Sequence, residues 1–187
     1  MKKGYIIAII VAAVVLLIVA IFAGGYNSLV SKEASVQEKS ANIDSQLQRR
    51  ADLIPNLVNT VKGYTDHESE VFAEVTAARE KLMSSQSMAE KSEANEEVTS
   101  SLNKLIAIAE SYPELKSDTV YVDLMDELAG SENRIAYARN EYNAAATEYN
   151  KAIRMFPGVI FANMFGFEKA ELFEAESSAS EVPEVSF

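Results

Sequence analysis

The chain has 187 residues, enough for one domain with additional segments, and 28 Asp and Glu against 17 Lys and Arg give a net charge of −11. This acidic balance would repel the phosphates of a nucleic acid, so we expect no nucleic-acid partner. With no Cys and a single His, the chain lacks the residues for a disulfide framework, a thiolate metal site or a cysteine nucleophile, and we expect no cofactor.

The first predicted element is a transmembrane helix over residues 5–23, which follows a short N-terminal segment of residues 1–4. All 19 residues of this run are apolar, and no charge occurs between Lys3 and Lys32. As an α-helix the run would extend about 28 Å, which matches the ~30 Å hydrocarbon core of a bilayer. The sequence therefore predicts a single-pass membrane protein.

A cleaved signal peptide is the main alternative for this run. Two features argue against it: the apolar stretch is longer than the usual signal core, and Ile21 stands where cleavage sites carry a small residue. A buried core helix is disfavoured because the run is apolar on every face. Lys2 and Lys3 before the run are balanced by Lys32 and Lys39 after it, so the side of the membrane that carries the domain stays open.

The next predicted helix continues directly from the membrane run. With only 7 Gly and 4 Pro, the composition favours long helices, and no turn signal separates this helix from the run. Its apolar stripe consists of Leu29, Val36, Ile43 and Leu47. We expect Pro55 to end this helix near residues 51–54, with Asp52 capping a second helix. A gentler kink at Pro55 is the alternative.

Three further helices are predicted from the spacing of apolar residues. The second helix ends in the polar stretch 84–87, and its apolar residues are Leu57, Val61, Val71, Val75, Ala78 and Leu82. The third covers about residues 89–110. A long seam predicts a fourth helix over 118–154, with Ser117 as its N-cap and Gly130 inside it. The seam consists of Tyr121, Leu124, Leu128, Ser131, Ile135, Ala138, Tyr142, Ala145, Tyr149 and Ala152, with Ile153 beside the last step. Because such stripes are stable only when they pack together, the predicted fold is all-α, an antiparallel up-and-down four-helix bundle.

The bundle domain is predicted over residues 26–167, and its last long helix stops at Pro157 and Gly158. Residues 159–167 are rich in Phe and Met, and we expect a short helix there that caps the bundle, with contact to the membrane surface as the alternative. Residues 168–187 are acidic and are expected to form a disordered tail.

Several strings in this order along the chain resemble the LemA family of bacterial membrane proteins. They are YNSLV (26–30), RRADLIPNLV (49–58), HE (67–68), AR (78–79), ESYPELK (110–116), ENRIA (132–136), R139, YN (142–143), YN (149–150) and FP (156–157). The resemblance implies a short exposed N-terminus, one transmembrane helix and a helical bundle. It implies no established reaction, and some relatives are linked to organising bacterial membrane compartments.

Catalytic and metal chemistry find no support in the sequence. His67 and Glu68, with Glu70, form the one imidazole–carboxylate cluster, but a zinc protease motif would need a second His where Val71 stands. No Gly-x-Ser-x-Gly string or Gly-rich phosphate loop occurs. We therefore expect that the protein is not an enzyme and that it has no catalytic, cofactor-binding or metal-binding residues.

The candidate interaction residues are polar groups at predicted helix positions. Arg49 and Arg50, followed by Asp52, stand where the first helix is predicted to end, and positive charge complements the negative end of a helix. The alternative is that one of the arginines reaches a carboxylate across the bundle or on a partner. Asn143 and Asn150 each follow a Tyr at seven-residue spacing, so we expect amides that fix helix register, with ligand binding as the alternative.

The last candidate is the C-terminus, where Val185 and Phe187 could dock into a carboxylate-binding domain, with a free end as the alternative. Together these features predict a membrane-anchored, non-enzymatic helical scaffold or interaction protein of the bacterial cell membrane. The alternative is an accessory or regulatory subunit of a membrane protease or transporter. The expected partners are the membrane itself, other membrane proteins and a second copy of the chain.

Overall fold

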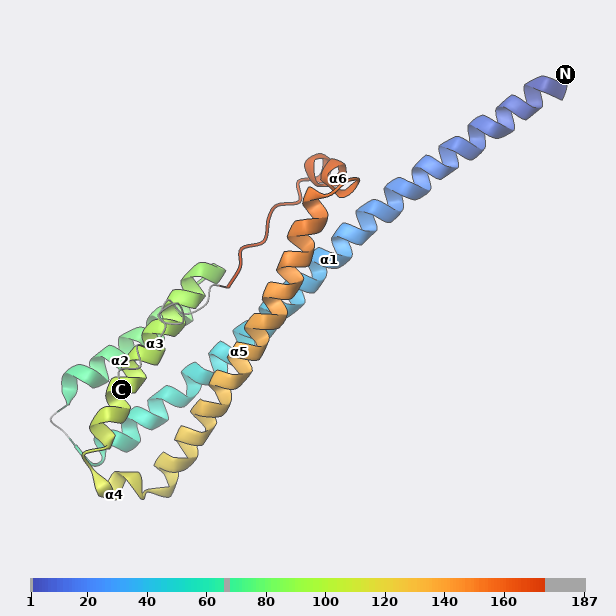
Figure 1. The fold of residues 1–187 in the computed structure, drawn as a ribbon. Coiled ribbons are helices and arrows are strands. Elements are labelled where there is room, and N and C mark those ends of the chain that lie inside the picture. Colours follow the sequence, from blue (N-terminus) through green and yellow to red (C-terminus); the bar gives the residue numbers. More distant parts are fainter. Residues whose placement is uncertain (1, 66–67, 174–187) are drawn as a thin grey trace, which may run out of the picture. The chain divides into compact units, whose positions relative to one another are not determined.

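The computed structural model describes residues 2–65 and 68–173, and these residues form six α-helices without any strand (Figure 1). The all-α class is therefore confirmed. The helices are α1 (Lys2–Lys62), α2 (Ser69–Ser84), α3 (Met88–Ala109), α4 (Pro113–Lys116), α5 (Thr119–Arg154) and α6 (Gly158–Phe165). Their contacts divide the chain into two compact units, unit 1 (Met1–Glu38 with Ala144–Ala170) and unit 2 (Lys39–Asn143 with Glu171–Phe187).

Helix α1 continues from the apolar run without a break, as predicted, but it does not end at Pro55. Proline has no N–H, so the carbonyl four residues earlier, that of Ala51, loses its helical donor. In unit 2 the Nε of Arg79 on α2 donates to this carbonyl at 2.8 Å. A side chain from another helix thus replaces the missing bond, and α1 runs on to Lys62.

The predicted second helix is wrong in its start, because Asp52 lies inside α1 and cannot cap α2. The turn between the two helices begins at Gly63, whose N–H donates to the carbonyls of Asn59 and Thr60 at 3.2 Å. The apolar residues assigned to the second helix divide between two helices, Leu57 and Val61 on α1 and Val71, Val75, Ala78 and Leu82 on α2. Helices α2 and α3 then lie side by side as a hairpin (Figure 1).

Helices α3 and α5 agree with their predicted ranges to within a residue or two, and α5 passes through Gly130 without interruption. The N-cap predicted for α5 is wrong by one residue. The carboxylate of Asp118 accepts from the N–H groups of Val120 and Tyr121 at 2.7 and 3.2 Å. The hydroxyl of Ser117 instead donates to carbonyls of α4, a short helix that the sequence pattern did not predict.

Helix α1 pairs with α5 in each unit, and the ion pairs give the direction. In unit 1, Lys32 contacts Glu148. In unit 2, Lys39 contacts Glu141 at 3.3 Å and Arg49 contacts Glu127 at 2.8 Å. In unit 2 the residue numbers rise on one helix as they fall on the other, so the two helices are antiparallel. The predicted stripe of α1 is buried along this pairing, at Leu29 and Val36 in unit 1 and at Ile43 and Leu47 in unit 2.

Unit 1 also contains α6 and the apolar run. Every side chain of residues 5–23 is classed as exposed among the residues that the structure describes. Helix α6 packs against α1 at the C-terminal end of this run, where the ring of Phe161 meets that of Phe22 edge to face at 5.2 Å between centroids. Gly166 ends α6 in the left-handed conformation (φ 74°) that favours glycine.

The start of the predicted tail differs from the expected disorder. Residues 168–173 form no helix or strand, yet side chains of α5 hydrogen-bond to their backbone at Ala170, Glu171 and Phe173. Such a segment satisfies its backbone groups without secondary structure. The rest of the predicted tail, 174–187, lies outside the described residues.

Candidate interaction site

Arg50 is the most buried charged residue that the structure describes, with 5% of its surface exposed. In unit 2 its Nη1 donates to Asn95 Oδ1 at 2.6 Å and contacts Glu132 Oε2 at 2.8 Å, and its Nη2 donates to Thr99 Oγ1 at 3.1 Å. The planar guanidinium, with its fixed fork of donors, can serve several acceptors at once. Arg50 therefore links α1, α3 and α5 in the interior of unit 2.

The helix-end interpretation of Arg50 is not supported, because α1 continues for three further turns beyond it. Its alternative, a carboxylate reached across the bundle, agrees with the contact to Glu132. The sequence reasoning missed Asn95, Thr99 and Glu132 as its partners. A signal was present at Asn95, which is a polar residue on the same buried face of α3 as Ala94 and Val98.

Arg49 and Asp52 point outward and are exposed. Arg49 donates to Glu127 on α5 at 2.8 Å, and this bond holds the pKa of the Glu127 carboxyl below its ordinary value. Asp52 accepts from the amide of Gln48 one turn earlier, at 2.8 Å. Both side chains lie on the surface of unit 2, so they stay candidates for contact with a partner.

Asn143 and Asn150 each bind a stretch of backbone through both ends of the amide. In unit 2, Asn143 donates to the carbonyl of Phe173 at 2.8 Å and accepts from the N–H of Phe173 at 2.9 Å. In unit 1, Asn150 makes the same pair of bonds with Ala170, both at 2.8 Å. The amides hold an extended segment and not a neighbouring helix, so the chain itself occupies the groups that a ligand would need.

Tyr142 adds a third hydrogen bond to this segment. Its hydroxyl donates to the carbonyl of Glu171 at 2.7 Å, and burial raises the pKa of this hydroxyl. A phenol that stays protonated keeps its donor available. The other predicted interaction residues, Val185 and Phe187, lie outside the described residues.

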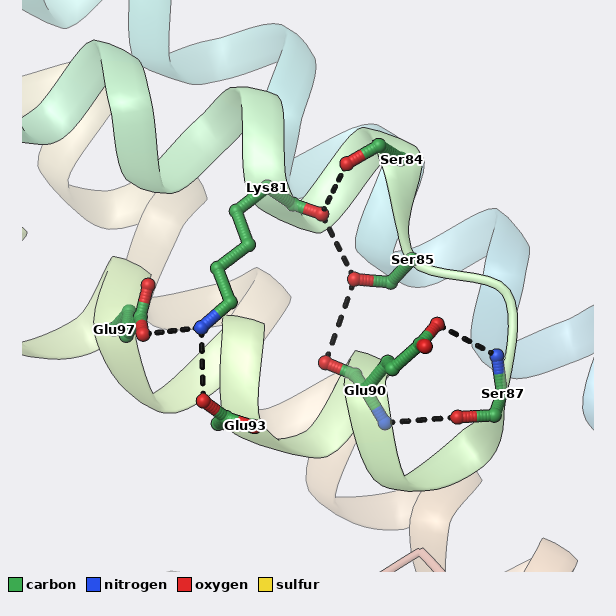
Figure 2. Close-up of polar contacts among 7 residues, drawn as sticks. All are labelled: Lys81, Ser84, Ser85, Ser87, Glu90, Glu93 and Glu97. Carbon is green, nitrogen blue, oxygen red and sulfur yellow. Dashed lines mark hydrogen bonds and ion pairs between the residues drawn. The ribbon is translucent and has the colours of Figure 1, made fainter.

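The turn between α2 and α3 is closed by a reciprocal capping box (Figure 2). The N–H of Glu90 donates to the Ser87 hydroxyl, and the Glu90 carboxylate accepts from the N–H groups of Gln86 and Ser87 at 2.8 and 3.2 Å. These backbone donors hold the pKa of Glu90 below its ordinary value. The carboxylate therefore has a structural role at the start of α3.

One lysine joins the two helices of this hairpin (Figure 2). Lys81 on α2 contacts Glu93 at 2.9 Å and also Glu97, both on α3. The two carboxylates raise the pKa of Lys81. The carboxylates of Glu93 and Glu97 are thus paired within the chain and tie α3 to α2.

In the part of the chain that the structure describes, no three His, Cys, Asp or Glu side chains come together in a group that could hold a metal ion. His67 lies outside the described residues. An open pocket of about 460 Å³ lies between Lys62 and the face of α2 that carries Phe72 and Thr76. Lys62 stands over the Phe72 ring at 5.2 Å, which is a cation–π contact and not an acid–base pair.

Comparison with known proteins shows the family of the chain. The chain is 28% identical to magnetosome protein MamQ of Magnetospirillum gryphiswaldense and to magnetosome protein MamQ 2 of Paramagnetospirillum magneticum, over 84% of this chain and 67% of each relative. It is 24% identical to protein LemA of Metamycoplasma hominis, over 83% of this chain and 71% of the relative. The family model described as LemA family matches residues 39–187, which include the buried Arg50 network, so the chain belongs to the LemA family.

Proposed function

We propose that this LemA-family protein is a single-pass, membrane-anchored, non-enzymatic helical scaffold that binds other proteins beside the bacterial membrane. One observation carries the proposal: the apolar residues 5–23 are all exposed side chains on a helix that continues into the domain. Leaving one large aliphatic side chain in water costs about 1.5–3 kcal/mol relative to an apolar environment, so a bilayer is the suitable surrounding for the run. The anchor then keeps the domain next to the membrane.

We also propose that α1, α2, α3 and α5 form an antiparallel up-and-down four-helix bundle. Ion pairs within unit 2 support this arrangement, since α1 and α5 run antiparallel and Lys104 on α3 contacts Glu74 near the start of α2. Antiparallel neighbours are the expected result of short connections. A rigid bundle of this kind presents a fixed surface to a partner.

The non-enzymatic part of the proposal is supported by the roles of the polar groups. The buried guanidinium of Arg50 and the amides of Asn143 and Asn150 are all bonded to other groups of the chain. Catalytic groups are usually held ready for a substrate in a pocket. The relatives named as magnetosome proteins support a role at a bacterial membrane compartment.

The scaffold proposal is tested by capturing partners from native membranes. We would purify the tagged full-length chain in mild detergent and compare the captured proteins with those held by the tagged segment 1–25 alone. The scaffold proposal expects a set of proteins that only the full-length chain retains, and the double variant Arg49→Ala, Asp52→Ala tests whether that exposed surface holds them. Identical sets for the full-length chain and the anchor segment would contradict the proposal.

One observation favours the second candidate function, an accessory subunit of a membrane protease or transporter. Gly24 ends the apolar run, and a Cβ built there meets no atom within 4 Å. Small residues allow transmembrane helices to approach closely. A photo-crosslinking residue at Gly24 that reaches the transmembrane segment of another protein would favour this candidate, whereas crosslinks only to the same chain would favour a homo-oligomeric scaffold.

A further inference from the structure

Unit 1 carries a second apolar region close to the end of the membrane run. No charged residue occurs from Met155 to Phe167, and α6 (Gly158–Phe165) occupies the middle of this stretch. Five large apolar side chains of this stretch are exposed, with these fractions of their surface accessible: Met155 (55%), Phe156 (81%), Ile160 (43%), Met164 (58%) and Phe165 (53%). Several large apolar side chains exposed within 11 residues of the chain indicate a contact with another molecule or with a membrane.

Contacts with α1 fix the position of α6 along the membrane helix. The ring of Phe161 packs on Phe22, and the ring of Tyr26 meets that of Phe165 at 4.8 Å between centroids. A Cβ added at Gly25 would lie 2.2 Å from the Phe161 ring, so glycine is what lets this ring approach α1 so closely. Helix α6 is therefore held at the level of Phe22 to Tyr26, within unit 1.

That level coincides with the lipid headgroups. Tyr26 lies three residues beyond Ala23, about 4.5 Å along the helix axis. A bilayer of ~40–45 Å with a hydrocarbon core of ~30 Å leaves about 5–7 Å of interfacial layer on each side. If residues 5–23 fill the hydrocarbon core, α6 lies in this interfacial layer.

We propose that α6, together with Phe156, inserts into the headgroup layer of the bilayer and forms a second, interfacial membrane contact of this chain. The proposal rests on the proposed membrane span of residues 5–23. Aromatic residues are enriched at this depth, and an apolar helix that lies in the interface buries its side chains about 5–10 Å into the headgroup boundary. The short helix thereby fixes the orientation of unit 1 at the membrane surface.

The charges that flank the stretch favour a lipid surface. Lys151 and Arg154 precede the stretch, and Glu168 and Lys169 follow it directly, which gives three basic residues and one acidic residue, a net charge of +2. Apolar burial drives the contact, and this small positive charge is attracted to the phosphates of the headgroups. The continuity of the exposed patch with the membrane helix identifies the bilayer as its occupant, in place of a second copy or another protein.

The chain contains no Trp, so a single introduced Trp is a unique fluorescent probe. We would make three full-length variants, Phe156→Trp at the proposed contact, Leu16→Trp in the membrane run and Thr147→Trp as the matched control. Thr147 is exposed on α5 next to Glu148, which pairs with Lys32 about 13.5 Å beyond Ala23 along α1. Each variant is reconstituted into phosphatidylcholine vesicles with or without bromine atoms on the acyl chains, at shallow or deep positions.

We expect Phe156→Trp to emit at shorter wavelength than Thr147→Trp and to lose most of its emission in vesicles brominated at the shallow position. Leu16→Trp should be quenched most by deep bromines, and Thr147→Trp should be quenched by neither. A second probe, Ile160→Trp, should behave like Phe156→Trp, and circular dichroism checks that each variant is folded.

The two proposals fail in different ways. If Leu16→Trp is quenched but Phe156→Trp and Ile160→Trp are not, the interfacial contact is wrong while the membrane span stands. Emission from these two probes that is shifted to shorter wavelength but not quenched would indicate that protein covers them, and it also overturns the interfacial contact. Quenching of Thr147→Trp as strong as that of Phe156→Trp would overturn the assignment to α6. If Leu16→Trp is not quenched, the membrane span itself fails, and the interfacial contact fails with it.

Discussion

Helix α1 is packed by different chemistry in the two units. In unit 1, aromatic rings and a glycine make its contacts with α6, where Phe161 lies on Gly25 and touches Phe22. In unit 2, a buried arginine, Arg50, connects α1 with polar groups on α3 and α5. Helix α1 thus makes a close apolar contact in unit 1 and carries a buried charge in unit 2.

The two kinds of contact differ in how strongly they depend on the directions of the groups involved. Apolar contacts are non-directional, so in unit 1 close packing at small residues provides the fit. A buried guanidinium donates only to partners in a fixed geometry. The free-energy cost of removing it from water is offset only when all of these partners are in place. We therefore expect substitutions in unit 2 to lower stability by removing hydrogen bonds. Substitutions in unit 1 should lower it by steric overlap at the close contacts.

The largest effect is expected at Arg50. The Arg50→Met variant keeps an unbranched apolar stem but removes the guanidinium, so Asn95 and Thr99 lose their donor and Glu132 loses its positive partner, which should lower the free energy of unfolding by about 3 kcal/mol. Thermal unfolding of the full-length chain in detergent, followed by circular dichroism, measures the change. The matched control Arg49→Ala breaks an exposed pair and should leave the unfolding temperature nearly unchanged. Equal effects of the two variants would contradict the role of Arg50 in the interior.

A smaller effect in unit 2 is expected where α1 passes Pro55. Arg79→Ala leaves the carbonyl of Ala51 without a donor, which should cost about 2 kcal/mol of unfolding free energy. Pro55→Ala restores an N–H four residues beyond that carbonyl, so the same Arg79→Ala change should cost clearly less in the Pro55→Ala background. A double-mutant cycle on unfolding free energies measures this coupling. Additive effects would show that Arg79 does not stand in for the missing N–H.

Two neighbouring glycines, Gly24 and Gly25, allow the close packing in unit 1 to be tested. A methyl group at Gly25 would meet the Phe161 ring at 2.2 Å, whereas one at Gly24 meets nothing within 4 Å. Overpacking of a tight contact costs about 1–3 kcal/mol, so Gly25→Ala should be less stable than Gly24→Ala by about 1–2 kcal/mol, although both gain the same helix propensity. Chemical denaturation in detergent compares the two. If the variants are equally stable, α6 does not pack on Gly25.

Local patterns in the sequence predict the helices well, because burial of an apolar stripe depends on residues within a few turns. The stripe from Leu29 to Leu47 is buried as predicted. Most of the seam from Tyr121 to Ile153 is also buried, but Leu124, Ala145 and Ala152 are only half-buried, and Ala146 is buried next to Ala145. The continuity of α1 with the apolar run also follows from local spacing alone.

The missed features depend on contacts between distant residues. Pro55 ends a helix by local rules, and only Arg79, 28 residues further along the chain, overrides them. Likewise the guanidinium of Arg50 donates to Asn95, which is 45 residues away in the sequence, and the residues next to Arg50 do not indicate this partner. The ordered segment after α6 was missed for the same reason, since its acidic composition indicates disorder until Asn143 and Asn150 supply bonds.

The smallest effect is expected at the turn between α2 and α3, and it depends on pH. Backbone N–H groups lower the pKa of Glu90 in the folded chain from the ordinary value of 4.5. A carboxyl with a lowered folded pKa contributes stability above the unfolded pKa, and this contribution is lost as the pH falls from about 4.5 through the lower folded value. The wild type should therefore unfold at higher temperature than Glu90→Gln at pH 7, and the difference should shrink as the pH is lowered below 4.5.

A Ser87→Ala variant separates this charge effect from the rest of the capping box. It removes the hydroxyl that accepts from the Glu90 N–H, a neutral bond that does not titrate in this range, so its deficit against the wild type should stay the same between pH 7 and pH 4. Unfolding temperatures at a series of pH values test both variants. A Glu90→Gln deficit that also stays constant with pH would mean that Glu90 acts through its shape and hydrogen bonds alone. In that case the surface of unit 2 would follow the same rule as unit 1, in which fit and not charge fixes the contact.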